Sequence, residues 1–333
     1  MIVLFRVDSS CVIGSGHLMR CLTLAKKFHV KEKAEIVFVC RDLEGNLSQL
    51  VVDAGYSLIL MTNTSDAGVL EGYEKWLNVP KTIDAKETCA VIVNLGKRPD
   101  YLVVDSYALD SEWERELRPL VEKIFVIDDL ANRPHDCDIL LDQNEYINKE
   151  SRYRGLVPKH CQLRLGYQHV LLRDEFYVAK ENLRKRDGCI RNILVFYGGS
   201  DHTNETMKAL NALSQIDLNG IKVDVVVGGS NVHKAEVEYF CNNSMFFSYY
   251  CQVNNMAELM AKADLALGAG GSATWERLYL DLPSIVTAIA ENQEQIAIDC
   301  QQQGLIEYLG RSEDVDENAI INAVCKYINM TIL

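Results

Sequence analysis

The sequence predicts an α/β protein built from two Rossmann-like domains, each a doubly wound parallel sheet. Its 333 residues are enough for two domains at roughly 100–200 residues per domain. Short β-branched or aromatic runs alternate with helical patterns in both halves, and this order is typical of a parallel sheet with helices on both faces. Several runs end in glycines or polar residues, as strands that carry ligand loops do.

The first half begins with an apolar run that we interpret as a strand. A helix is expected next, at 18–28, because apolar residues spaced by three and four share one face there. Those apolar residues are Leu18, Cys21, Leu22, Ala25 and Phe28. Strands are expected at 2–7, 35–39, 101–104 and 124–127.

The second half repeats the same alternation. Strands are expected at 192–197, 222–227, 264–267 and 284–288. We expect an N-terminal domain at 1–165, a linker at 166–190 and a C-terminal domain at 191–333. Because ligand loops lie at the carboxyl ends of parallel strands, the two domains are expected to face a shared cleft.

The composition excludes several classes of protein. Hydrophobic residues make up 48% of the chain and charged residues 24%, as in ordinary globular proteins. A net charge of −13 argues against a broad nucleic-acid-binding face. No apolar run reaches the roughly 18 residues of a membrane helix, so neither nucleic acid nor membrane is an expected partner. The eleven cysteines have no metal-like spacing, and we interpret them as reduced thiols in the cytoplasm.

A glycine-rich loop follows the strand expected at 264–267. Gly270 and Gly271 let the backbone approach a ligand closely. Ser272 is the expected N-cap of the next helix, whose first N–H groups can bind a diphosphate. Glu276, one turn further, can accept hydrogen bonds from ribose hydroxyls. The alternative is a tight turn with a solvated glutamate.

A second glycine turn, Gly198-Gly199-Ser200, follows the strand expected at 192–197. Alone it is as consistent with a plain turn as with an anion site. Two such loops on one sheet edge, however, can flank a single diphosphate. No Walker lysine is present, which removes support for ATP-type phosphoryl transfer.

The stretch IGSGHLMR places a histidine after Gly14 and Gly16. His17 is expected in the first turn of a helix, where the positive end of the helix dipole disfavours the imidazolium ion. An uncharged ring beside glycines suits a general base that activates water. The alternative is a histidine that caps a turn or is half-buried. Asp8 either orients this ring or the water, or caps the local turn.

Other polar residues at strand ends are less specific. Tyr107 could hydrogen-bond a sugar substituent or a phosphate, or it could be a core tyrosine. Asp128 and Asp129 are expected to serve turns and caps, since no converging ligands for a metal are visible. We therefore expect no metal and no cofactor.

Four stretches resemble one family along nearly the whole chain. They are RVDSSCVIGSGHLMRCLTLA, DDLANRPHDCDILLDQN, LGYQHVLLRDEF and LGAGGSATWERLYLDLPSIVTAIAENQ. The sequence is similar to the UDP-2,4-diacetamido-2,4,6-trideoxy-β-L-altropyranose hydrolases of pseudaminic acid biosynthesis. That family is in turn similar to the glycosyltransferase that adds N-acetylglucosamine in peptidoglycan synthesis, which implies a GT-B fold.

The resemblance implies hydrolysis of a UDP-sugar at the anomeric C–O bond with inversion, yielding a precursor of flagellin or surface glycans. It implies that His17 is the base and that Tyr107 and Asn292 act with it. The glycine loop, Glu276 and Gln293 would bind UDP.

Three other functions stay open. A GT-B glycosyltransferase would use a larger acceptor in place of water. In a NAD-dependent oxidoreductase, GSGHLM would be the dinucleotide-binding loop, with Met19 in the third glycine position and Asp42 as the ribose-binding acid. A non-catalytic sugar-binding module would leave His17 unexplained.

Overall fold

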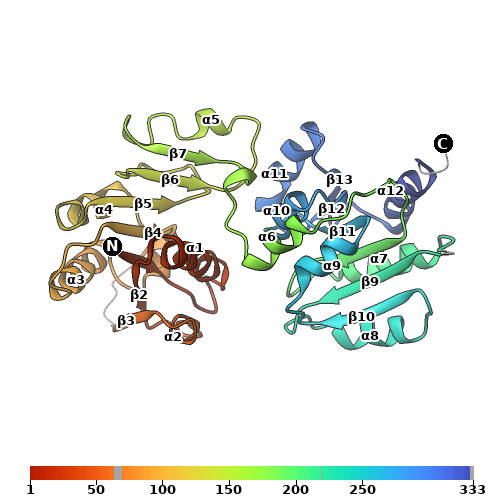
Figure 1. The fold of residues 1–333 in the computed structure, drawn as a ribbon, viewed down its shortest axis with the longest axis horizontal. Coiled ribbons are helices and arrows are strands. Elements are labelled where there is room, and N and C mark those ends of the chain that lie inside the picture. The colour runs from red at the N-terminus through yellow and green to blue at the C-terminus, as the bar shows by residue number, and fades with distance from the viewer. Residues whose placement is uncertain (64–69, 219, 331–333) are drawn as a thin grey trace. The chain divides into compact units, whose positions relative to one another are not determined.

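The computed structural model describes residues 1–63, 70–218 and 220–330. The chain divides into two compact units (Figure 1). Unit 1 comprises Met1–Asn144 and Asn148–Leu171, and unit 2 comprises Glu145–Ile147 and Leu172–Leu333. The division at Leu171 lies inside the stretch expected to be a linker, and much of that stretch is structured.

Unit 1 is a seven-stranded parallel sheet with the strand order β3-β2-β1-β4-β5-β6-β7. The strands are β1 (Ile2–Val7), β2 (Glu35–Arg41), β3 (Ser57–Met61), β4 (Tyr101–Asp105), β5 (Lys123–Ile127), β6 (Ile139–Asp142) and β7 (Gln162–Leu165). The helices are α1 (Gly16–Glu32), α2 (Gln49–Asp53), η1 (Gly72–Trp76), α3 (Lys81–Asn94), α4 (Ser111–Leu117), η2 (Arg118–Leu120), α5 (Lys149–Arg152) and η3 (Tyr167–His169).

Helices cover both faces of this sheet. Side chains alternate between the faces along each strand, so neighbouring residues of one strand enter different cores. Leu4 of β1 packs with the α3 and α4 side, together with Trp113. Val3 and Phe5, its neighbours, pack with Leu18 on the α1 side. Near-continuous apolar strands are what a parallel sheet covered on both faces requires.

Unit 2 is a six-stranded parallel sheet with the order β10-β9-β8-β11-β12-β13. The strands are β8 (Asn192–Phe196), β9 (Lys222–Val227), β10 (Phe247–Cys251), β11 (Leu265–Ala269), β12 (Ser284–Ala288) and β13 (Glu307–Arg311). The helices are α6 (Asp174–Glu181), α7 (Glu205–Ser214), α8 (Lys234–Asn242), α9 (Met256–Lys262), α10 (Ala273–Tyr279), α11 (Glu291–Gln302) and α12 (Glu317–Met330).

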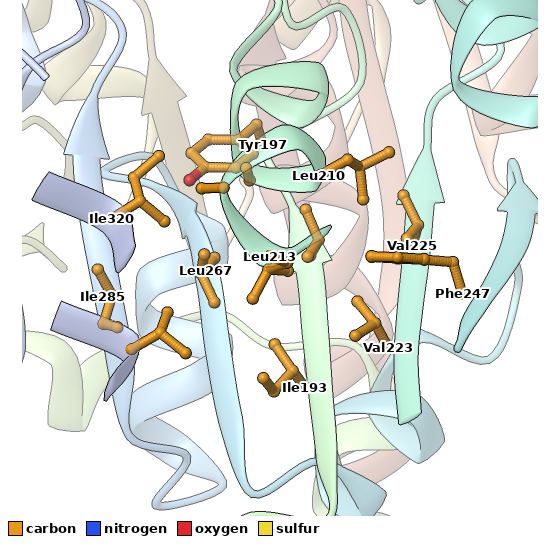
Figure 2. Close-up of a cluster of buried hydrophobic side chains, with 14 of the residues drawn as sticks. Ile193, Tyr197, Leu210, Leu213, Val223, Val225, Phe247, Leu267, Ile285 and Ile320 are labelled. Carbon is orange, nitrogen blue, oxygen red and sulfur yellow. The ribbon is translucent and has the colours of Figure 1, made fainter. Parts of the chain in front are cut away.

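The core of unit 2 lies between its sheet and helices α7, α8 and α12. Leu210 and Leu213 of α7 lie over Ile193 and Val223, and Ile320 of α12 completes the cluster (Figure 2). All five residues are 0% exposed. This core belongs to unit 2 alone.

Each sheet reverses its strand order once, and ligands of open α/β sheets bind outside the carboxyl ends of strands at that point. In unit 1 the reversal lies between β1 and β4, which pair in parallel. In unit 2 it lies between β8 and β11. The loops that follow these four strands contain most of the residues predicted to form the site.

No helix in the described ranges combines the length and apolarity that crossing a bilayer demands.

Candidate active site

His17 stands at the start of α1, directly after the loop that leaves β1. The loop closes through a hydrogen bond from the Gly14 N–H to the Ser10 carbonyl at 2.9 Å. Gly14 has φ of +77°, a left-handed conformation that glycine adopts without strain. The turn therefore begins the helix at Gly16 rather than at residue 18, and His17 is buried in its first turn.

Asp105, the last residue of β4, orients the His17 ring. The Nδ1 atom of His17 lies 2.6 Å from Oδ1 of Asp105, whose side chain is fully buried. Burial alone would raise the pKa of Asp105, but Arg20 and His17 outweigh it and hold that pKa well below its usual range. Asp105 is therefore a carboxylate, which assigns the proton to Nδ1 and leaves Nε2 as an acceptor. Within the described part of the chain, no hydrogen bond engages Nε2.

Arg20 lies one helical turn after His17 and binds two carboxylates. Its Nε and Nη2 atoms donate to the two oxygens of Asp105 at 2.6 and 2.7 Å. Its Nη1 donates to Oδ2 of Asp129 at 3.0 Å. Nη2 also lies 3.1 Å from Nδ1 of His17. Because Nδ1 carries the proton, we assign the Nη2 hydrogen bond to Asp105.

Tyr107 joins this network through its hydroxyl, which donates to Oδ1 of Asp129 at 2.6 Å. Burial, and then the Asp129 carboxylate, raise the pKa of Tyr107 well above its usual range, so the phenol is neutral at physiological pH. The ring stands edge-on to His17, with centroids 4.7 Å apart. The two catalytic residues predicted in unit 1 therefore lie together. Asp129 binds Arg20 and Tyr107 and does not serve the turn or cap predicted for it.

Asp8 does not orient the histidine, which corrects one of the two roles predicted for it. Its Oδ1 accepts from the Arg41 backbone N–H at 2.7 Å and pairs with Arg6 at the same distance. Arg6 binds Asp84 of α3. Asp8 directly follows β1 and lies two residues after Arg6, so both side chains point to the α3 face, whereas α1 covers the other face.

The Gly198 loop of unit 2 is held by contacts on both sides. Gly198 has φ of +96°. The Gly199 carbonyl accepts from the Ser230 hydroxyl at 3.0 Å. Asp201 caps α7, since its carboxylate accepts from the N–H groups of Glu205 and Thr206 at 3.0 and 2.9 Å. These bonds fix the backbone around Ser200.

The Gly270 loop follows β11, directly beside β8. A Cβ on Gly270 would come within 3.2 Å of the Gln293 Cβ, so the loop packs against the start of α11. Gln293 is itself held by the Ile289 N–H, which donates to its Oε1 at 3.1 Å. The structure thus brings together Gly270, Gly271 and Gln293, and places the Gly198 loop on the neighbouring strand.

Ser272 differs from its predicted role. It occupies the position before α10, but its side chain makes no capping hydrogen bond. Its φ and ψ of −56° and −28° are already helical, whereas a capping serine has an extended backbone. The hydroxyl is therefore not engaged in closing the helix.

Glu276 projects from α10 and is mostly buried, with its side chain 20% exposed. Its Oε1 lies 3.5 Å from Nη2 of Arg173. Burial raises the pKa of Glu276, and Arg173 partly offsets this. A carboxylate with one edge open to solvent can accept the two hydrogen bonds of a ribose diol.

Arg277, next to Glu276, was not singled out by the sequence. It stabilises the Gly270 loop by hydrogen bonds to the residues on either side of that loop. It is 1% exposed, and its Nη2 donates to the Ala269 carbonyl and the Thr274 hydroxyl at 2.8 and 2.9 Å. Burial lowers the pKa of Arg277 to about 10, so it remains charged at neutral pH. Its place in the sequence, on the helix after a glycine loop, was the only available signal.

Asn292 is exposed in the first turn of α11, after β12. β12 is not the last strand of the chain, as the sequence suggested, because β13 follows it. Among the described residues, no group of three or more His, Cys, Asp or Glu side chains is arranged to hold a metal ion.

Comparison with known proteins confirms the resemblance. Residues 192–326 match the Glycosyltransferase family 28 C-terminal domain. The UDP-2,4-diacetamido-2,4,6-trideoxy-beta-L-altropyranose hydrolase of Campylobacter jejuni is 28% identical over 313 residues, covering 92% of this chain and 99% of that protein. The spore coat polysaccharide biosynthesis protein SpsG of Bacillus subtilis is 30% identical over 171 residues, about half of each chain.

Solved structures show the fold. MurG of Acinetobacter baumannii superimposes with a TM-score of 0.66 at 11% identity, covering 100% of this chain and 92% of that one. UGT89C1 of Arabidopsis thaliana, solved in complex with UDP, gives a TM-score of 0.65 at 9% identity, covering 99% and 93%. The chain therefore has the GT-B fold, with two Rossmann-like parallel-sheet units.

Proposed function

We propose that this protein hydrolyses UDP-2,4-diacetamido-2,4,6-trideoxy-β-L-altropyranose at the anomeric C–O bond, with inversion, and releases UDP and the free sugar. The observation that carries the proposal is the hydrogen bond between His17 and Asp105. It leaves the outer ring nitrogen as a proton acceptor. The similarity of nearly the whole chain to the Campylobacter hydrolase supports the choice of substrate.

The chemical step uses His17 as a general base. Its Nε2 takes a proton from water, and the water oxygen attacks the anomeric carbon. The bond between that carbon and the diphosphate oxygen breaks, and UDP leaves with the electron pair. Asp105 stabilises the imidazolium that forms, as a buried carboxylate does in hydrolases of the serine-triad type. A single displacement from the opposite face inverts the anomeric centre.

Tyr107 and Asn292 assist this step in the proposal. The neutral Tyr107 phenol donates to Asp129 and lies against the base, where its oxygen can still accept a hydrogen bond from an O–H or N–H group of the sugar. Asn292 offers an exposed amide that can both donate and accept. Gly14 and Gly16 leave the approach to His17 free of side chains, since a Cβ at either glycine would meet no atom within 4 Å.

UDP is held by unit 2 in this proposal. Backbone N–H groups of Gly198, Gly199 and Ser200 flank one side of the diphosphate, and those of Gly270, Gly271 and Ser272 the other. Glu276 accepts from the ribose hydroxyls, and Gln293 lies against the second loop. The pairing of β8 with β11 supports this arrangement, because it puts both loops at one switch point.

Proton NMR of the purified protein with the UDP-linked diacetamido sugar, and with no acceptor present, tests the proposal. We expect UDP and free sugar in equal amounts, with the first-formed anomer opposite to that of the substrate. UDP release only after addition of an acceptor would identify a glycosyltransferase, which the family 28 domain makes the second candidate. Retention of the anomer would exclude the single displacement.

The product fits the synthesis of pseudaminic acid, a precursor of flagellin or surface glycans. We further propose that the reaction takes place in the cytoplasm. All eleven cysteines are free thiols, and thiols persist in that reducing compartment.

A further inference from the structure

Three aromatic rings cluster with that of the candidate base, His17, and two of them come from a segment that the proposed mechanism does not use. The ring of Trp76, at the end of η1, stands edge-on to His17 with centroids 5.9 Å apart. It lies 5.3 Å from Tyr107 and 4.9 Å from Tyr73. Tyr73 also contacts Tyr107 at 5.2 Å. We call Tyr73, Trp76 and Tyr107 the aromatic wall.

The two η1 rings are not core residues. Leu77 and Val79, which follow η1, are 0% and 1% exposed and anchor the segment in the core. Tyr73 is 40% exposed, and Trp76 is half-buried. Large apolar rings that stay open to solvent beside a catalytic histidine are typical of a ligand-binding surface.

We propose that the aromatic wall binds the apolar, methyl-bearing part of the sugar and makes the site selective for deoxy, N-acetylated sugars. The inference rests on the proposed function. The sugar of that substrate carries two acetamido methyl groups and a methyl group in place of the C6 hydroxymethyl. Such groups gain from burial against rings, whereas a hydroxyl in the same position would lose its hydrogen bonds to water.

The residues of the aromatic wall contribute mainly apolar contacts, rather than hydrogen bonds, to the proposed ligand. The Tyr107 hydroxyl is held by Asp129 at 2.6 Å, so this phenol presents its ring to a ligand more than its donor. Neither Tyr73 nor Trp76 is a proton donor or acceptor in the proposed step. They act on specificity, and their removal should change substrate binding more than the rate of the chemical step.

Tryptophan fluorescence gives a test that does not require turnover. The chain has three tryptophans, and Trp113 and Trp275 are only 1% and 2% exposed. Acrylamide should therefore quench mainly Trp76. In the His17→Asn variant we expect the UDP-diacetamido sugar to protect Trp76 from acrylamide, and UDP alone to give no protection. The Trp76→Phe variant controls for the other two tryptophans. Equal quenching with the sugar nucleotide and with UDP would overturn the inference.

Kinetics give the second test. Trp76→Ala should raise KM for the UDP-diacetamido sugar at least about tenfold, within the range of roughly 10–200-fold that one apolar contact sets, with kcat changed much less. Trp76→Phe should retain most of the affinity. Tyr239→Ala removes a 74% exposed ring of unit 2 and should change nothing. An unaltered KM in a folded Trp76→Ala protein would also overturn the inference.

The two proposals fail in different ways. If the wild-type protein releases no sugar, the hydrolase proposal is wrong, while protection of Trp76 by the sugar nucleotide still decides whether the wall binds it. If hydrolysis proceeds normally in Trp76→Ala, only the wall is wrong.

Discussion

Asp105 determines what the histidine can do. Its carboxylate fixes the Nδ1 proton of His17 and accepts in turn from Nε and Nη2 of Arg20. Asp105 directly follows the strand expected at 101–104, but the sequence could not pair it with His17. The two residues are 88 positions apart and meet only if β4 lies beside β1. Asp8, close to His17 in sequence, was the more obvious partner and points to the opposite face.

Replacing His17 by asparagine removes the proposed base and keeps a polar side chain of similar size. Because a positioned base contributes about 10²–10⁴ in rate, turnover should fall at least about a hundredfold, with UDP affinity little changed. Steady-state kinetics and calorimetry with UDP measure the two quantities. Turnover that survives the substitution would show that another group accepts the proton.

Asp105→Asn tests the orientation of the ring. The amide can donate to Nδ1, which would move the ring proton to Nε2 and remove the acceptor facing water. We expect turnover to fall on the order of 10²–10⁴-fold, while UDP affinity, set by unit 2, stays constant. Thermal unfolding of the variant separates this effect from lost stability, since Arg20 also loses a carboxylate. A variant that is folded and fully active would refute the assigned tautomer.

The Glu276 carboxylate makes UDP affinity depend on pH. Its pKa is raised by burial, so it takes up a proton at a higher pH than an ordinary glutamate. Only the ionised form accepts two hydrogen bonds from the ribose, and UDP affinity should therefore weaken as pH falls through this raised pKa. Calorimetry of Glu276→Gln supplies the control, because protonation of UDP itself affects both proteins equally. Parallel pH curves for the two proteins would remove Glu276 from the ribose role.

At the scale of elements, most central strands could be predicted and the edge strands could not. The strands at 2–7, 222–227 and 284–288 have the predicted boundaries, and the other predicted strands differ by one or two residues. β3, β6, β7, β10 and β13 were not predicted. Four of them are edge strands that are only partly buried, whereas β6 is fully buried but only four residues long. The sequences of β7, β10 and β13 are interrupted by polar residues or glycine and lack the continuous apolar run that marks a strand covered on both faces.

Gly228 and Gly199 differ in whether the surrounding structure has room for a side chain. A Cβ on Gly228, after β9, would overlap the backbone carbonyl oxygen of Gly199, whereas a Cβ on Gly199 would meet its nearest atom at 3.9 Å. Gly228→Ala should destabilise unit 2 by about 1–3 kcal/mol and weaken UDP binding by displacing the Gly198 loop. Denaturant unfolding and calorimetry measure the two effects. Gly199→Ala is the matched control, and an equal loss of stability in both variants would contradict this packing.

At the scale of the whole molecule, each unit has its own sheet and its own core. The predicted fold class follows from this duplication and is confirmed. The sequence could show the two halves because each repeats the alternation of strand and helix. It could not show which strands are neighbours, and for that reason it missed Arg20 and assigned Asp129 to a turn or cap.

Two cores predict two unfolding transitions in calorimetry. UDP at a hundred times its Kd should stabilise one unit by about 2.7 kcal/mol, and we expect that unit to be unit 2. Trp275 reports on unit 2, and Trp76 and Trp113 report on unit 1, so fluorescence of single-tryptophan variants assigns each transition. A shift confined to the unit 1 transition would mean that UDP binds unit 1, and it would contradict the proposed UDP site in unit 2.

His17 and Arg20 lie one turn apart on α1. Both bind Asp105 at the end of β4, and Arg20 also binds Asp129, which follows β5. The hydrogen bonds of these two side chains therefore fix the rotation of α1 about its axis. A slip by one residue turns the helix by about 100°. It would break the hydrogen bonds of His17 and of Arg20 together, with no partly bonded state between. Heating should accordingly abolish catalysis in a single step, ahead of any loss of the sheet beneath it.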